Sequence, residues 1–382
     1  MKDILYFDNA ATTPVEKETA FAMLPYWVTH YGNASSTYAL GREAREALEC
    51  CRLKIADYLN CKDEGLYFTS GATESNNLLI KGLAHANKGK HIITSCIEHP
   101  SVLNTCKELE KEGYRVTYLG VNRDGRIKTS ELQKAITTRT TLVTIMLVNN
   151  EIGTIQPMDK ISQICKEKGV ILHSDITQAV GHLPVNIKRI GIDSFSASGH
   201  KFGAPKGIGM AYVAPGIKCS PLMVGGGQEK GMRAGTENVA SVVGMEYAIN
   251  LCIKRKARYM SKMEGLQKTF FERLGNVQYR VNTPEMYRVP NIISVSFYNV
   301  DGESLKLFLD TKGICVSTGS ACHSGNSEPS HVLKAIDVPD KCINGTIRIS
   351  FNNLNDREEV EYLADCIKDY LKGVNKNEIS RE

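Results

Sequence analysis

The stretch TLVTIMLVNNEIGTIQPMDKISQICKEKGVILHSD at residues 141–175 decides the fold class. It contains a short apolar strand at 141–148, a helical segment, and a second apolar strand at 170–174. Two apolar strands separated by a helix are typical of a crossover unit, in which both strands lie parallel in one sheet. The apolar character of both strands indicates a sheet that is covered on its two faces.

The same alternation extends outward in both directions from this stretch. Further apolar strands are predicted at 66–69, 91–95, 114–119, 194–198 and 207–213. The segments between them have the length and character of helices, so the sequence predicts an α/β domain with a mainly parallel central sheet. We assign residues 15–252 to this large domain.

Beyond Cys252 the pattern changes. A long charged helix is predicted at 253–274, strands at 291–297 and 346–351, and a last helix near 356–372. This order indicates a smaller α+β domain, to which we assign 1–14 and 253–382. A chain of 382 residues is long for a single hydrophobic core, which agrees with two domains.

Composition and charge exclude several classes of function. The net charge of +5 is not gathered into a basic run with aromatic residues, so direct nucleic-acid binding is not expected. The N-terminal sequence lacks the pattern of a secretory signal, and the apolar run 141–148 is too short to cross a bilayer. We therefore expect a cytoplasmic protein without a membrane anchor. The 12 cysteines include no CxxC pair, so neither a zinc site nor a redox dithiol is expected.

Two charged side chains are expected at the carboxyl edge of the large sheet. Lys201 follows the strand 194–198 in the turn SGHK, and a desolvated lysine can lose its proton and form a Schiff base with an aldehyde. Asp175 ends the strand 170–174, and a carboxylate is the partner that the pyridinium nitrogen of pyridoxal phosphate (PLP) needs. Ligands of open α/β sheets bind at this edge. Taken alone, Lys201 could be a surface lysine and Asp175 a helix N-cap.

A candidate phosphate site lies in LYFTSGATESNNLLI at 66–80, which reads as a strand, a turn of small residues and a helix start. Gly71, Ala72 and Thr73 would offer backbone N–H groups and a hydroxyl at the helix N-terminus, where hydrogen bonding and the helix dipole favour a phosphate. The run from Thr73 to Asn76 also fits a simple helix cap, and that alternative stays open.

An ordered set of motifs resembles a known family. The motifs are DNAATTP at 8–14, YGNASS at 31–36, SGATESNN at 70–77, EHPSV at 98–102, NNEIGTIQP at 149–157, SGHK at 198–201, GGGQEKGMRAGTEN at 225–238 and STGSAC at 317–322. Together they look like a cysteine desulfurase of the NifS/IscS-like branch, within the class V aminotransferases of PLP fold type I. The resemblance runs from residue 3 to about residue 370.

This resemblance implies PLP as the cofactor and assigns residues to it. Lys201 would be the Schiff-base lysine and Asp175 the pyridinium partner, while Asn150 and Gln178 would contact the ring hydroxyl. The expected phosphate contacts are Ala72, Thr73, Ser198 and His200. Thr236 matches a threonine that reaches the phosphate in the neighbouring subunit, so the resemblance also implies a homodimer.

The same resemblance names residues that act on the substrate, L-cysteine. His99 matches a histidine over the cofactor ring that assists proton transfer, a role that suits imidazole because it titrates near neutral pH. Arg348, with Asn150, would bind the substrate carboxylate, and the neighbours Ile347 and Ile349 should face the other way from its side chain. Without the motifs, His99 would be read as a helix cap or buried imidazole and Arg348 as an ion-paired strand residue.

Cys322 lies in the polar loop VSTGSACHSGNSEPSHVL at 316–333. A thiolate there can be carried to the substrate sulfur and then to a partner, although an incidental loop thiol is the alternative. The resemblance implies that Cys322 takes the sulfur as a persulfide, leaving L-alanine. It also implies transfer to an acceptor such as an iron–sulfur scaffold protein or a tRNA-thiolation enzyme. Cys322 is also a candidate for a transient iron–sulfur ligand, and no resident metal is expected.

Other functions remain as alternatives. A selenocysteine lyase would share nearly all of these residues, and another class V aminotransferase or β-lyase would share the PLP residues without needing Cys322. A non-enzymatic sulfur relay is disfavoured because Lys201 and Asp175 are present. A dinucleotide-binding dehydrogenase is disfavoured because GGGQEKG does not sit at a strand-to-helix turn. Ile176 stands where the family usually has an alanine against the cofactor ring, so we expect it to tilt the ring or narrow the pocket.

Overall fold

The structure, a computed structural model, describes residues 4–318 and 329–379, with side chains described as far as Gly373. Its centre is a seven-stranded sheet in the order β2-β8-β7-β6-β5-β3-β4. In that order the strands are Leu66–Thr69, Gly209–Val213, Ser194–Ser198, Ile171–Asp175, Thr140–Thr144, His91–Ser95 and Arg115–Leu119. β8 runs antiparallel to both of its neighbours, and the other neighbouring pairs are parallel. The prediction of a mainly parallel sheet is confirmed.

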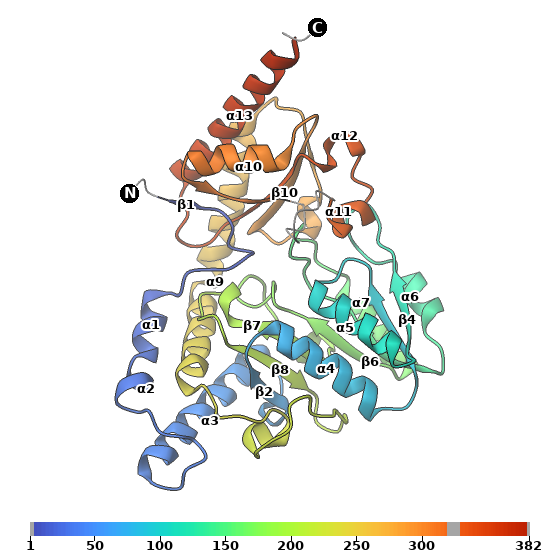
Figure 1. Ribbon diagram of the computed structural model, residues 1–382, viewed down its shortest axis with the longest axis vertical. Helices are drawn as coiled ribbons and strands as arrows, with labels where there is room; N and C mark the ends of the chain where they lie inside the picture. Colours follow the sequence, from blue (N-terminus) through green and yellow to red (C-terminus); the bar gives the residue numbers. More distant parts are fainter. Residues whose placement is uncertain (1–3, 319–328, 380–382) are drawn as a thin grey trace.

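Helices cover both faces of this sheet, which explains why strands such as β3, β7 and β8 are buried along their whole length (Figure 1). On one face Ile92 and Leu142 pack with helices α4 (Ala72–Ala86) and α5 (Pro100–Lys111). On the other face Ile93 and Val143 belong to a core that also includes residues of α3 (Ala39–Leu59), α7 (Met158–Lys168), α8 (Ile187–Ile190) and α9 (Val239–Leu274). The short helix α6 (Thr129–Ala135) lies beside α7 (Figure 1).

A second, smaller core is built on an antiparallel sheet in the order β12-β13-β10-β9. These strands are Ser317–Thr318, Thr346–Ser350, Ile292–Phe297 and Tyr279–Val281. The second half of α9, α10 (Gly302–Thr311) and α13 (Arg357–Ile379) pack around it, and buried residues such as Phe270, Val295 and Ile347 form its centre. The long helix α9 therefore passes from one core to the other (Figure 1).

The N-terminal segment also joins the two cores. β1 (Leu5–Tyr6) pairs in parallel with β11 (Ile314–Cys315), and Phe7 is buried in the smaller core. Three residues later, Ala10 is buried in the larger one. The chain then continues into α1 (Lys17–Met23) and α2 (Pro25–Val28), which lie beside α9. Residues 8–12 consequently lie between the two parts of the molecule.

A small apolar cluster closes the contact between the two parts on another side. Val332 of α11 (His331–Ala335) and Ile343 of α12 (Asp340–Ile343) are buried with Ile97 and Ile152 of the large part. No helix in the described part of the chain is both long enough and apolar enough to span a bilayer.

Three predicted boundaries were wrong. The last helix, α13, extends to Ile379 instead of ending near residue 372. β5 ends at Thr144 rather than at Val148, because the N–H of Met146 turns away to the Glu98 carboxylate, 3.0 Å from each oxygen. α9 begins at Val239 rather than at 253, with the Asn238 side chain accepting from the N–H of Ser241 at 3.2 Å. Its first turns are apolar and buried, so the charged half alone does not mark its start. The boundary placed at 252 falls within α9, and the division into domains stays a prediction.

Candidate active site

A cleft of about 660 Å³ opens at the carboxyl edge of the large sheet. Its walls come from the N-terminal segment, the turn before α4, the ends of β6 and β7, and β13 of the smaller sheet. Ten predicted site residues line it: Ala72, Thr73, His99, Asn150, Asp175, Gln178, Ser198, His200, Lys201 and Arg348. A cavity of about 730 Å³ at the opposite edge, beside the starts of β6 and β7, contains none of them.

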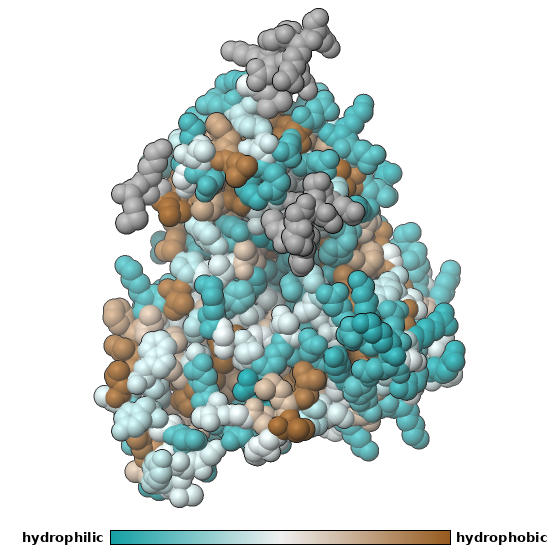
Figure 2. Space-filling model, in the orientation of Figure 1, coloured by the Kyte–Doolittle hydropathy of each residue, from teal (hydrophilic) through white to brown (hydrophobic). Residues whose placement is uncertain are grey.

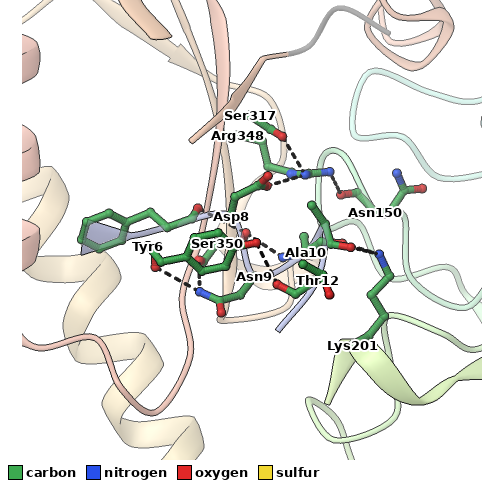
Figure 3. A network of polar contacts seen from close by, with 12 residues as sticks. Tyr6, Asp8, Asn9, Ala10, Thr12, Asn150, Lys201, Ser317, Arg348 and Ser350 are labelled. Atoms are coloured by element: carbon green, nitrogen blue, oxygen red, sulfur yellow. Dashed lines mark hydrogen bonds and ion pairs between the residues drawn. The ribbon is translucent and has the colours of Figure 1, made fainter. Parts of the chain in front are cut away.

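Lys201 ends the short 3-10 turn η2 (Gly199–Lys201) that follows β7, and its side chain points to the N-terminal segment (Figure 3). Its Nζ donates to the carbonyl oxygens of Ala10 at 2.8 Å and Ala11 at 2.6 Å. Burial and the nearby Arg348 guanidinium lower the pKa of Lys201 to about 8. A fraction of this amine is therefore neutral, and nucleophilic, near physiological pH.

Asp175 is buried at the end of β6, where its carboxylate has two protein donors. Oδ2 accepts from Nδ2 of Asn76 at 2.8 Å, and Oδ1 accepts from the N–H of Thr177 at 2.9 Å. Asn76 is itself oriented by Ser196, whose hydroxyl donates to Oδ1 of Asn76. This network holds a carboxylate at the floor of the cleft, about one crossover unit from Lys201 in the chain.

His99 combines the two roles considered from the sequence. It caps α5, because its Nδ1 accepts from the N–H of Ser101 at 3.1 Å, and its ring also lines the cleft. Burial lowers the pKa of His99, with Asp175 opposing this effect and Lys201 adding to it. Since Nδ1 is the acceptor, Nε2 carries the proton of the neutral ring and is free to act in the cleft.

The turn before α4 offers backbone N–H groups to the cleft. Gly71, with φ at +156°, precedes the first turn of the helix, where Ala72 and Thr73 line the cleft. Strand β8 passes so close that a Cβ atom on Gly209 would lie 2.5 Å from Cα of Gly71. Ser198 and His200 line the same cleft at the end of β7. The arrangement suits a phosphate at a helix N-terminus.

Arg348 reaches the cleft from β13, across from Lys201 (Figure 3). It donates to the carbonyl of Asn150 at 3.0 Å, to the Asp8 carboxylate at 2.6 Å and to Oγ of Ser317 at 3.0 Å. The strand alternation is as predicted, since Ile347 and Ile349 are fully buried in the smaller core. Nε of Arg348 is buried without a partner, so the guanidinium keeps a donor for a ligand.

The cleft has the polar groups that a PLP molecule would need. A carboxylate lies at its floor, a lysine at its wall, and a helix N-terminus at one end. Oε1 of the buried Gln178 is without a partner, although Nε2 of the same side chain donates to the carbonyl of Ala10 at 3.0 Å. A ring hydroxyl could satisfy that acceptor. Among the described residues, no group of His, Cys, Asp and Glu side chains is arranged to hold a metal.

The family model described as aminotransferase class-V matches residues 5–363, a range that contains all of the residues found to line the cleft. The chain belongs to the class V aminotransferase family. Two similar relatives are both named cysteine desulfurase IscS. The one from Methanosarcina thermophila is 45% identical, over 96% of this chain and 92% of its own length. The one from Dictyoglomus turgidum is 46% identical, over 96% and 94%.

Solved structures agree with these relatives. A NifS-like protein superposes with a TM-score of 0.92 at 37% identity, covering 97% of this chain and all of its own. The structure described as SspA in complex with cysteine has a TM-score of 0.81 at 37% identity, covering 91% of this chain and 98% of its own. The fold of this class V chain is therefore that of PLP fold type I, as predicted.

The expectation for Ile176 was wrong. Its side chain is fully buried in the core of the large part and does not line the cleft, where Thr177 stands instead. Ile176 lies on the same side of the chain as Leu172, opposite to Asp175, so the period of two along β6 continues past its end. In this chain the isoleucine is therefore part of the core and not of the cleft wall.

Two further expectations concern residues outside this cleft. Thr236 is exposed and does not line the cleft of its own chain. Cys322 lies outside the described residues. The described residues on both sides of it contact the cleft region: Ser317 accepts from Arg348 at 3.0 Å, and Ser330 donates to the Glu151 carboxylate at 2.5 Å.

Sequence reasoning missed two residues of this class V site, Asn76 and Ser101. Nδ2 of Asn76 donates both to Asp175 and, at 2.9 Å, to Oγ of Ser101, which in turn lies 2.8 Å from Nδ1 of His99. One amide thus connects the two side chains expected to act on the cofactor ring. The sequence did offer a signal, because Asn76 stands at helical spacing before Leu79 and Leu83 and so falls on the apolar face of α4. In the structure Asn76 is fully buried there.

Proposed function

We propose that this protein is a PLP-dependent cysteine desulfurase, which converts L-cysteine to L-alanine and takes up the sulfur on Cys322. The main support for the proposal is that Lys201, Asp175 and the N-terminus of α4 line the same cleft. The relatives named cysteine desulfurase, at 45% and 46% identity over nearly the full chain, support the choice of L-cysteine as substrate.

In this proposal the cleft binds PLP through residues with distinct roles. Lys201 would hold it covalently, Asp175 would pair with its ring nitrogen, and Gln178 and Asn150 would contact its ring hydroxyl. Ala72 and Thr73 at the start of α4, together with Ser198 and His200, would bind its phosphate. When bound, PLP supplies an electron sink that stabilises negative charge at the substrate Cα.

The chain's own residues bind the substrate and move its protons. Arg348, with its unpartnered Nε, binds the carboxylate of L-cysteine, and Asn150 lies beside it. The neutral amine of Lys201 is suited to accept the Cα proton, because its pKa of about 8 leaves it partly unprotonated. His99 offers Nε2 for protons at the thiol and at Cα.

Cys322 is the proposed sulfur acceptor. Its thiolate forms a bond to the substrate sulfur as the Cβ–S bond breaks, which leaves a persulfide on Cys322 and, after protonation, alanine. None of the eleven cysteines in the described part of the chain lines the cleft. Burial raises the pKa of ten of them, to about 12 for Cys51, Cys61, Cys106, Cys165, Cys219 and Cys252. Such thiols are poor nucleophiles, which supports Cys322.

We further propose a homodimer in which Thr236 reaches the phosphate bound by the other subunit. Thr236 is exposed, as this role requires. Large apolar side chains are also exposed nearby in the loop before it, at Leu222, Met223 and Val224. Others gather over α1 and α2, namely Phe21, Leu24, Trp27 and Val28 (Figure 2, lower left). Exposed apolar groups of this kind are typical of a subunit contact.

After the reaction, the persulfide would pass to a sulfur acceptor such as an iron–sulfur scaffold protein or a tRNA-thiolation enzyme, in the cytoplasm.

Product analysis tests the proposed function directly. The purified protein, loaded with PLP, should release alanine from L-cysteine, with sulfide appearing only when a thiol reductant is present. Pyruvate and ammonia would instead identify a β-lyase, and transfer of the amino group to a keto acid would identify an aminotransferase. A protein that does not take up PLP at all would contradict the whole proposal.

The lowered pKa of Lys201 predicts how cofactor capture depends on pH. Only the neutral amine attacks the aldehyde of PLP, so the rate of capture by the cofactor-free protein should be half-maximal near pH 8. Below that pH the rate should fall by about tenfold for each unit, and above it the rate should level off. Arg348→Met removes a positive neighbour and frees the Asp8 carboxylate, so the midpoint should move to higher pH. Stopped-flow absorbance measures the rate, and a midpoint near the ordinary lysine value of about 10.4 would contradict the account.

A further inference from the structure

The loop 225–238, which carries Thr236, is attached to the body of its own subunit by two ion pairs. It lies between β8 and α9, and most of its residues are open to solvent. An exposed loop rich in glycine can adopt many conformations, and two ion pairs to the body of the subunit restrict that freedom.

The first attachment is the buried pair Arg52–Glu229. The guanidinium of Arg52, on α3, donates to both oxygens of Glu229 at 2.8 Å, and each side chain is only 2% exposed. One oxygen of Glu229 also accepts from the N–H of Phe68 in β2, at 2.7 Å. To reach this position, Glu229 and Lys230 adopt left-handed φ angles of +47° and +58°. Such angles cost stability in residues other than glycine, so the pair fixes the loop against a local preference.

The second attachment is the pair Arg233–Glu74. Nε of Arg233 donates to Oε1 of Glu74 at 2.8 Å, and one terminal nitrogen donates to Oε2 at 3.3 Å. Glu74 lies in the first turn of α4, lines the cleft, and accepts from the N–H of Ser70 at 2.8 Å. Arg233 is thus bound to the same turn that is expected to hold the phosphate of its own subunit.

The backbone next to Thr236 is fixed as well. The N–H of Gly235 donates to Oε1 of Gln228 at 3.2 Å, and the N–H of Ala234 donates to the carbonyl of Met223 at 3.4 Å. Glu229 and Arg233 both precede Ala234 and Gly235 in the loop, and Thr236 follows them directly. Thr236 itself is exposed and does not line its own cleft, so these contacts fix a conformation that its own site does not use.

We propose that the ion pairs Arg52–Glu229 and Glu74–Arg233 position Thr236 for the cofactor phosphate of the second subunit. This inference rests on the proposed PLP site and homodimer. The inference adds that the phosphate turn 69–73 of one subunit is linked by hydrogen bonds to the loop that presents Thr236 to the other subunit. The links lie at the two ends of the turn, where the N–H of Phe68 donates to Glu229 and Glu74 accepts from Arg233. Arg52, Glu229, Glu74 and Arg233 are then positioning residues for the phosphate site of the other subunit, although Glu74 also lines the cleft of its own.

Mixed dimers with two affinity tags can test this inference by separating effects within a subunit from effects across the dimer. One subunit carries Lys201→Ala, so the visible absorption band of lysine-linked cofactor comes from the other subunit alone. The double substitution Glu74→Gln with Arg233→Met is then placed in the Lys201→Ala subunit. Removing both charges together leaves no unpaired carboxylate beside the phosphate turn. The readout is the PLP concentration that half-saturates the band, which does not depend on turnover.

Loss of a hydrogen bond to a charged phosphate weakens binding by about tenfold or more, so the half-saturating concentration should rise by that amount. Glu229→Gln in the same subunit should act in the same direction. The matched control is Arg255→Met, which removes the ion pairs of Arg255 with Glu16 and Glu18; none of these three residues lines the cleft or belongs to the loop 225–238. It should leave the titration unchanged. Thermal unfolding of each mixed dimer verifies that the variants are folded.

An unchanged titration with both loop variants would overturn the inference. Thr236→Ala in the Lys201→Ala subunit separates this result from a failure of the proposed function. If that substitution raises the half-saturating concentration while the ion-pair variants do not, Thr236 acts across the dimer without needing the ion pairs. If Thr236→Ala also has no effect, the proposed role of Thr236 across the dimer fails, and the inference fails with it.

Discussion

Lys201→Ala is expected to abolish alanine formation from L-cysteine, with a loss of more than about 10³-fold in kcat, within the range for a positioned general base. The residue has two roles in this account, as the covalent holder of PLP and as the base at the substrate Cα. No other lysine replaces it in the contact to the carbonyls of Ala10 and Ala11 within the described part of the chain. Alanine release measured by amino-acid analysis, with PLP added in excess, tests the expectation.

Two further variants separate chemistry from charge and from folding. Lys201→Arg keeps a positive charge in the cleft but cannot lose its proton, so it should be as inactive as Lys201→Ala. Lys262→Ala is a matched control, because Lys262 is also partly buried and donates to a backbone carbonyl, that of Asn353 at 2.6 Å, outside the cleft. It should keep most of the activity. An active Lys201→Arg protein would contradict the role of a neutral amine.

Cys322→Ser is expected to reduce alanine formation by at least about 10³-fold, on the scale seen when an enzyme loses its nucleophile. A hydroxyl is a far weaker nucleophile toward sulfur than a thiolate, so the Cβ–S bond of the substrate should stay intact. PLP binding should be unaffected, because the assigned cofactor contacts lie elsewhere. Steady-state alanine release and the cofactor absorption band, measured on the same sample, test both expectations.

The control for Cys322→Ser is Cys50→Ser, which replaces an exposed cysteine of α3 that does not line the cleft. Its activity should match that of the unsubstituted protein. Retained alanine formation in Cys322→Ser would mean that the sulfur leaves without a protein nucleophile. The chain would then be read as a lyase of the same fold.

Much of the large sheet could be predicted because its strands are buried on both faces. The apolar runs at 66–69, 91–95 and 194–198 coincide with β2, β3 and β7. The placement of Lys201 and Asp175 in one cleft followed from a geometric rule, since carboxyl ends of parallel strands meet at one edge. Ile176 could have been placed by the same kind of rule, because the alternation along β6 puts it opposite to Asp175.

Such rules could not predict the contacts between distant parts of the chain. Arg348 binds Asp8, and Lys201 binds Ala10 and Ala11, because the N-terminal segment runs between the two cores. No local periodicity indicates where such a segment will lie. The Asn76 network depends likewise on three elements meeting, α4, β6 and the start of α5. The motif contained Asn76, but only the folded chain shows which carboxylate its amide reaches.

A single turnover with L-cysteine tests the central claim most directly. The PLP-loaded protein is mixed with one equivalent of L-cysteine per active site and no other thiol, because excess L-cysteine would itself reduce a persulfide. Alanine is then quantified, and the peptides of the digested protein are analysed by mass spectrometry. The account predicts one alanine for each active site and one additional sulfur atom on the peptide that contains Cys322. Alanine without added sulfur on that peptide, or pyruvate in place of alanine, would contradict it.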